Sequence, residues 1–158
     1  MMTSAELKTI RESLGLTVQW LADQAHVRLR TAQYWEAGRF QIPDDVAQMV
    51  LDIERRVALI VAETLQQFDE MCKRSGTPDK HVLLRYRSEY DLWHFYPDME
   101  PLPASTHASL LARIRTALIE QGITTVIQYM EPAEYMVWLD GRKDSQTLRA
   151  LWAGLEDA

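Results

Sequence analysis

Five polar side chains in one short stretch near the N-terminus are of the types that proteins use to contact nucleic acid. At helical spacing, residues 28–37 turn the following side chains outward: Arg28, Arg30, Thr31, Gln33 and Tyr34. Arginine can hydrogen-bond both acceptors of guanine, and glutamine can pair in the same bidentate way with adenine. We therefore predict that Arg30, Gln33 and Tyr34 contact base edges in double-stranded DNA.

A second set of side chains around this stretch is predicted to contact phosphates: Thr17, Arg28, Thr31 and Arg39. Thr17 is expected to cap the preceding helix, where backbone amides point toward an anion. Phosphate contacts of this kind fix the position of a protein on the duplex without reading its sequence. The alternative interpretation, a merely solvated helix face at Arg30 and Gln33, stays open at this point.

Three short helices are needed to position these side chains, and the sequence predicts them over residues 4–14, 17–25 and 28–37. Gly15 and Gly38 follow the first and third, as glycine commonly does just past a helix. A common set of apolar residues is expected to fix the angle between the second and third helices: Leu21, Ala22, Val27, Ala32 and Trp35. This arrangement would let the third helix enter a major groove about 12 Å wide.

The remainder predicts a long helix followed by a smaller mixed region. Apolar residues recur at helical spacing over residues 43–72, and the polar turn-forming stretch 75–79 follows. Strands are expected over 81–87, 124–130 and 135–139, and helices over 88–95, 105–121 and 144–155. The predicted fold class is mainly α: a helix-turn-helix bundle (1–74), whose last helix is long and connecting, and a small α+β domain (80–158).

Composition and charge narrow the functional classes. The chain has 158 residues, 47% hydrophobic and 25% charged, which is typical of a soluble globular protein. Its net charge is −6, but residues 1–43 carry five basic and four acidic side chains, whereas the other 115 carry twelve and nineteen. The acidity therefore lies outside the predicted DNA-contacting region.

We expect no membrane segment, because no run approaches the roughly 20 apolar residues needed to span a bilayer. The single cysteine, Cys72, fits a reducing cytoplasm and excludes an internal disulfide. The four histidines are scattered, so no metal site and no cofactor are predicted. No P-loop, GxGxxG or GxSxG motif occurs, and an enzyme is not expected.

The stretches 14–22 and 27–39 resemble the helix-turn-helix of phage repressors and Cro proteins. Residues 33–39, read as Gln-Tyr-Trp-Glu-Ala-Gly-Arg, and the following Ile42-Pro43-Asp44-Asp45-Val46 are more specific. They resemble the anti-CRISPR-associated repressors and a related group of uncharacterised bacterial helix-turn-helix proteins. The likeness covers residues 3–60 well and continues weakly to Leu111, whereas residues 124–158 have no counterpart.

This resemblance implies a homodimer formed through the C-terminal domain, which represses its own operon at inverted repeats. It also implies that Arg11 on the first helix pairs with Glu36 on the third as a structural salt bridge; a DNA contact by Arg11 is the alternative. We therefore expect a sequence-specific transcriptional autorepressor in the cytoplasm. Two other interpretations stay open: an antitoxin-like protein whose C-terminal domain binds a partner, and a regulator that binds RNA, which the resemblance permits.

Overall fold

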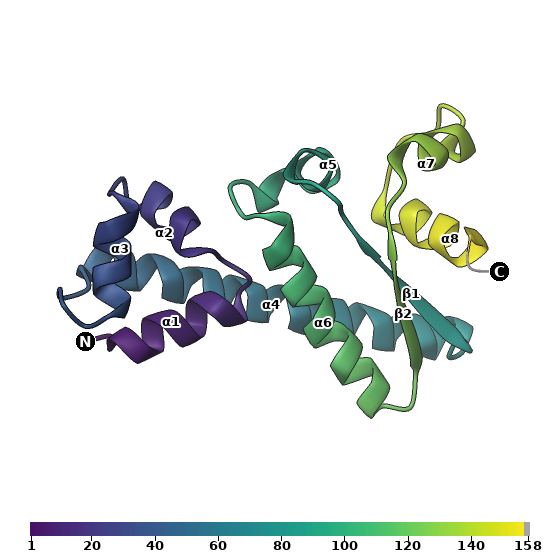
Figure 1. Cartoon of the computed structure of the whole chain (residues 1–158). Coiled ribbons are helices and arrows are strands. Elements are labelled where there is room, and N and C mark those ends of the chain that lie inside the picture. The colour runs from purple at the N-terminus through teal and green to yellow at the C-terminus, as the bar shows by residue number, and fades with distance from the viewer. Residues whose placement is uncertain (157–158) are drawn as a thin grey trace. The chain divides into compact units, whose positions relative to one another are not determined.

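The structure is a computed structural model that describes residues 1–156, and it confirms the predicted mainly α fold class with a small α+β part. In the described residues the strands form one two-stranded parallel sheet. The chain divides into two compact units, Met1–Ile60 and Val61–Ala158, called unit 1 and unit 2 below. Figure 1 shows the order of the helices and strands along the chain. The division falls inside helix α4 (Asp44–Ser75). The sequence predicted two domains, residues 1–74 and 80–158. These limits stay a prediction, because the boundary between the two units lies within a helix to which both units contribute residues.

Unit 1 contains three short helices and the first half of α4. The short helices are α1 (Ser4–Ser13), α2 (Val18–Gln24) and α3 (Leu29–Glu36). Each begins near its predicted start because the local signals are strong: Thr3 and Glu6 form a capping box on α1, and Thr17 caps α2. One buried apolar cluster holds all four helices together: Leu7, Leu21, Ala22, Ala32, Trp35, Ile42, Val46 and Val50.

Glycine ends the first and third helices of unit 1. Gly15 and Gly38 have φ angles of +67° and +71°, in the left-handed region that side chains with a Cβ rarely adopt. The amide of Gly38 donates to the carbonyl of Trp35 at 3.2 Å, which closes the last turn of α3. The chain can therefore reverse directly after the predicted DNA-contacting helix and enter α4.

Unit 2 is built around a two-stranded parallel sheet. Strand β1 (Lys80–Arg85) pairs with β2 (Thr124–Tyr129), and Arg85 is the register partner of Tyr129 at the end of both strands. Parallel pairing needs a long crossover, which α5 (Glu89–Phe95), a 3-10 turn (Pro97–Met99) and α6 (Ala104–Glu120) provide. Helix α6 packs on both strands and α8 (Gln146–Glu156) packs on β1.

One predicted strand was wrong. Residues 135–139 belong to helix α7 (Pro132–Leu139). Pro132 stands in the first turn, where a missing N–H costs nothing, and the buried Tyr135 and Leu139 are four residues apart on one helical face. Asp140 then adopts a left-handed conformation with φ of 49°. The aromatic and β-branched residues of this segment suggested a strand, but helical packing in unit 2 overrides that preference.

Buried aromatic side chains and one buried cation fill the core of unit 2. Tyr135 contacts the rings of Phe95 and Trp152 at centroid distances of 5.8 and 5.6 Å. Its hydroxyl donates to Asp144 Oδ1 at 2.6 Å, and Asp144 also pairs with Arg149, whose guanidinium lies 4.7 Å from the ring of Tyr96. Aromatic side chains from three helices of unit 2 and from the turn after α5 therefore stabilise its interior.

Candidate nucleic-acid interface

The turn between α2 and α3 sets the direction of the third helix. Thr17 Oγ1 accepts from the amide of Trp20 at 3.0 Å and so fixes the start of α2. At the other end, His26 has a φ of +56°, and the amide of Val27 donates to the carbonyl of Ala22 at 3.0 Å. The chain therefore turns sharply within the few residues between Gln24 and Leu29, as a helix-turn-helix requires.

The inner face of α3 is anchored in the core of unit 1. Ala32 is fully buried and Trp35 is 3% exposed, and both belong to the cluster that contains Leu7 and Leu21. Rotation of α3 about its axis would expose Trp35 and leave a cavity behind it. The outward direction of the opposite face is therefore determined by the packing of unit 1.

The outer face of α3 carries the three predicted base-contacting residues. Arg30 and Gln33 are exposed, and Tyr34 is half-buried. Arg30 Nε donates to the hydroxyl of Tyr34 at 2.6 Å, and the Arg30 guanidinium carbon lies 5.5 Å from the centre of the Tyr34 ring. Tyr34 uses only the Nε donor of Arg30, so both terminal amino groups of Arg30 remain to donate hydrogen bonds. These amino groups can donate to the O6 and N7 acceptors of a guanine.

Arg39 approaches the same ring from beyond the end of α3. Its guanidinium carbon lies 5.3 Å from the centre of the Tyr34 ring. A cation over an aromatic face is attracted by the ring's quadrupole. Tyr34 thus connects a predicted base contact, Arg30, with a predicted phosphate contact, Arg39.

The other predicted phosphate contacts lie around α3 with differing accessibility. Thr17, Arg28 and Arg39 are exposed, whereas Thr31 is half-buried. Arg28 was expected to be the first residue of the third helix, but α3 begins at Leu29 and Arg28 precedes it with an extended backbone (φ −71°, ψ 148°). Its side chain therefore does not share the helical periodicity of Arg30 and Gln33.

Arg11 and Glu36 form an ion pair between α1 and α3. Arg11 Nε donates to Glu36 Oε1, and Nη2 donates to Oε2 at 3.1 Å. The two side chains are 10% and 12% exposed, and Arg11 Nη1 also donates to the carbonyl of Leu16 at 2.7 Å. Arg11 is therefore turned into unit 1 rather than toward solvent.

The sequence of this chain matches a known family. A family model described as Aca2/YdiL-like matches residues 2–123, which is most of the chain. The chain belongs to the Aca2/YdiL-like family. The resemblance inferred from the sequence motifs is thereby confirmed.

A curated relative of this Aca2/YdiL-like chain is the Aca2 repressor of Pectobacterium phage ZF40. The two are 47% identical over 53 residues, which is 33% of this chain and 46% of the relative. The chain thus matches just under half the length of that relative. The family match ends at Ile123, so β2, α7 and α8 lie beyond it.

One aromatic side chain beside the predicted base contacts was not predicted from the sequence. Phe40 is 53% exposed directly after Arg39, and its ring meets that of Tyr34 edge to face at 5.0 Å and 84°. An aromatic residue just after the end of a helix gives no periodic signal, so only the path of the chain after Gly38 reveals the contact. Phe40 therefore packs against the same Tyr34 ring that Arg30 and Arg39 also approach.

Two further properties of the described chain bear on function. Among residues 1–156, no helix is both long and apolar enough to cross a membrane. In the same range, no group of three or more His, Cys, Asp or Glu side chains is placed to hold a metal ion.

Proposed function

We propose that this chain is a sequence-specific DNA-binding transcriptional regulator that acts as a dimeric autorepressor on an inverted repeat. The observation that carries the proposal is the outer face of α3, where Arg30 and Gln33 are exposed beside Tyr34. Membership of the Aca2/YdiL-like family and a relative named as a repressor support it. No catalytic role is proposed for any residue.

The proposed contacts divide into two classes. Arg30, Gln33 and Tyr34 contact base edges, because they lie on or beside the exposed face of one helix. The surrounding residues contact phosphates: Thr17, Arg28, Thr31 and Arg39. The hydrogen bond from Arg30 to Tyr34 reduces the freedom that Arg30 would lose on binding DNA, which favours affinity.

A dimer is proposed because an inverted repeat presents two equal half-sites, which a two-fold symmetric protein can contact at once. The centres of these half-sites should lie about 34 Å apart, or a multiple of that distance. Unit 2 offers apolar surface for pairing. Its exposed apolar side chains include Met136, Val137, Leu151 and Leu155, of which Val137 is 81% exposed. Apolar surface of this kind is common where proteins associate.

The first test is a selection of bound sequences from random duplex DNA by the full chain. An inverted repeat with a fixed spacing should emerge. If no sequence is enriched, or if the matching single-stranded transcript binds more tightly than the selected duplex, the proposal is overturned.

The second test separates base contacts from phosphate contacts. Arg30→Ala should weaken binding to the selected duplex by about 1–3 kcal/mol and have little effect on random DNA. Arg39→Ala is the matched variant, and it should weaken both by similar factors. Lys8→Ala, on the exposed side of α1, should change neither. Equal losses on both DNAs for Arg30→Ala would show that Arg30 contacts only phosphate.

A further inference from the structure

Phe40 and Tyr34 form a cluster of two aromatic rings at the end of α3. The Phe40 side chain is 53% exposed, and its ring meets that of Tyr34 edge to face at 5.0 Å. The backbone at this position is also fixed, because the carbonyl of Tyr34 accepts from the amides of Arg39 and Phe40 at 2.9 and 3.3 Å. Phe40 is therefore held beside the last turn of α3, next to a predicted base contact.

The polar part of Tyr34 already has a partner in the chain, whereas the exposed ring of Phe40 has no polar group. The hydroxyl of Tyr34 accepts from Arg30 Nε at 2.6 Å, and the guanidinium of Arg39 lies 5.3 Å from the ring centre. Because apolar surface in water is unfavourable, burying the Phe40 ring against a ligand would strengthen binding of that ligand.

The charges around Phe40 indicate which kind of ligand covers the ring. Residues 27–43 contain one carboxylate, Glu36, and three arginines: Arg28, Arg30 and Arg39. Glu36 is 12% exposed and paired with Arg11, so the exposed charge around Phe40 is positive. An apolar protein surface would bury these arginines without partners, which is unfavourable. Duplex DNA instead supplies phosphates for the arginines and apolar groups on its base edges for the ring.

We propose that Phe40 contacts the 5-methyl group of a thymine in the half-site and so selects thymine at one position. Thymine alone among the four bases presents a methyl group in the major groove, and phenylalanine is one of the side chains that contact it. Because the ring lies beside Tyr34, this thymine should neighbour the base pair that Tyr34 contacts. The contact rests on the proposed DNA binding by α3, and it adds Phe40 to the residues that read the operator.

Removal of the methyl group from the DNA tests this contact. In the duplex selected by the full chain, each thymine position of the half-site is replaced in turn by deoxyuridine, in both half-sites at once. Deoxyuridine lacks only the 5-methyl group and still pairs with adenine. At one position, wild type should bind the deoxyuridine duplex roughly fourfold more weakly for each half-site, as expected for one methyl group that is no longer buried.

Variants of the protein then show whether Phe40 is the side chain that contacts this methyl group. Phe40→Ala should bind the thymine and deoxyuridine duplexes equally, whereas Phe40→Leu keeps an apolar side chain and should retain part of the difference. Arg39→Ala should weaken binding to both duplexes and preserve their ratio. Leu59→Ala is the matched control, because Leu59 is an equally exposed apolar residue of unit 1 (57%) that lies on α4, and it should leave the ratio unchanged.

Failure of this contact can be distinguished from failure of DNA binding. If the selection enriches no duplex, the proposed DNA binding and the thymine contact are both overturned. If an operator is found but no thymine in it depends on its methyl group, or if the difference persists in Phe40→Ala, only the role of Phe40 is overturned. Phe40→Ala that weakens the thymine and deoxyuridine duplexes equally would place the ring on the sugar-phosphate backbone and would overturn that role as well.

Discussion

Replacing Glu36 with alanine should destabilise unit 1 substantially, because it leaves the charge of Arg11 buried without its partner. Arg11 is 10% exposed, and its guanidinium binds both oxygens of Glu36. Removing one member of a buried ion pair typically costs about 3–5 kcal/mol. We expect the lower end, about 3 kcal/mol, because the carbonyl of Leu16 still accepts from Arg11 and Glu12 lies 3.7 Å away.

Urea unfolding can be monitored by tryptophan fluorescence, because Trp35 is buried and directly precedes Glu36 in the sequence. With a slope near 2 kcal/mol per molar urea, the midpoint of the transition that exposes Trp35 should fall by about 1.5 M. In a double-mutant cycle, adding Arg11→Ala to Glu36→Ala should recover about 2 kcal/mol, because the unpaired charge is removed as well.

The matched control for this prediction is an exposed ion pair. Asp69 and Lys73 lie four residues apart on α4 at 2.9 Å and are 60% and 74% exposed. Asp69→Ala should leave the midpoint essentially unchanged, because exposed pairs contribute little. If Glu36→Ala proves as harmless as Asp69→Ala, or if the cycle shows no coupling with Arg11, the pair does not stabilise unit 1 and the reasoning is refuted.

Three further outcomes are expected. If each protomer of a dimer contacts phosphates through Arg28 and Arg39, a plot of log K for DNA binding against log salt concentration should have a slope of about −3.6. Arg39→Ala should make this slope shallower by about 2. An unchanged slope would show that Arg39 does not contact phosphate. His107 takes up a proton near its usual pKa of 6.5 only when the chain unfolds, since its folded pKa is about 4. The free energy of unfolding should therefore fall by up to about 3 kcal/mol as the pH drops through this window, and His107→Gln should flatten that dependence in urea titrations at several pH values. Gly38→Ala should lower the free energy of unfolding by about 1 kcal/mol, because the backbone φ of +71° strains any residue that has a Cβ. Space is not the cause, since a Cβ at this position would lie 3.4 Å from its nearest atom, Ser4 Oγ. A thermal melt that matches wild type would contradict this expectation.

Local signals explain why the helices of unit 1 could be predicted from the sequence. Thr17 caps α2, Gly15 and Gly38 follow α1 and α3, and Trp35 falls on the same helical face as Ala32. Each of these preferences acts over three or four residues, and all of them agree. The outward placement of Arg30 and Gln33 follows from the same periodicity.

Residues 135–139 show where local signals fail. Their β-branched and aromatic side chains fit a strand as well as a helix, and the choice depended on how Tyr135 and Leu139 pack in unit 2. The contact between Phe40 and Tyr34 likewise depended on the path of the chain after Gly38.

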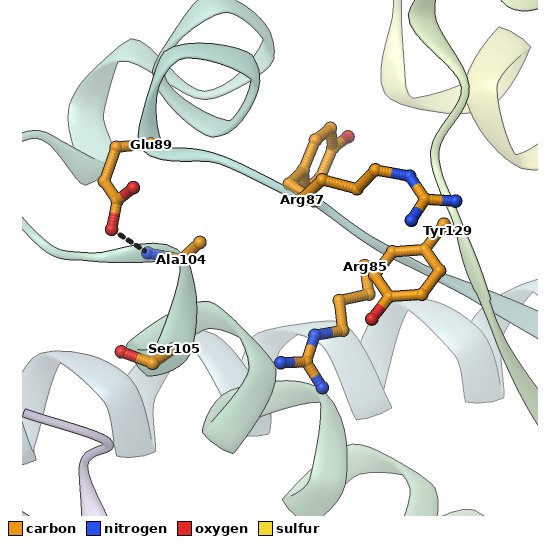
Figure 2. A pocket seen from close by; sticks show the side chains of 7 residues that line it. Arg85, Arg87, Glu89, Ala104, Ser105 and Tyr129 are labelled. Atoms are coloured by element: carbon orange, nitrogen blue, oxygen red, sulfur yellow. Dashed lines mark hydrogen bonds between the residues drawn. The ribbon is translucent and has the colours of Figure 1, made fainter.

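Helices α1, α2 and α3 and the residue types on the outer face of α3 were predictable from the sequence, because helix propensity, capping and periodicity are short-range properties of the chain. The grouping of Arg85, the start of α6 and Tyr129 around one cavity (Figure 2), in contrast, is visible only in the folded chain. Those residues are brought together by the parallel pairing of β1 with β2, which joins segments more than forty positions apart. Such pairing depends on burial of the whole unit, and no local pattern encodes which strand ends will meet.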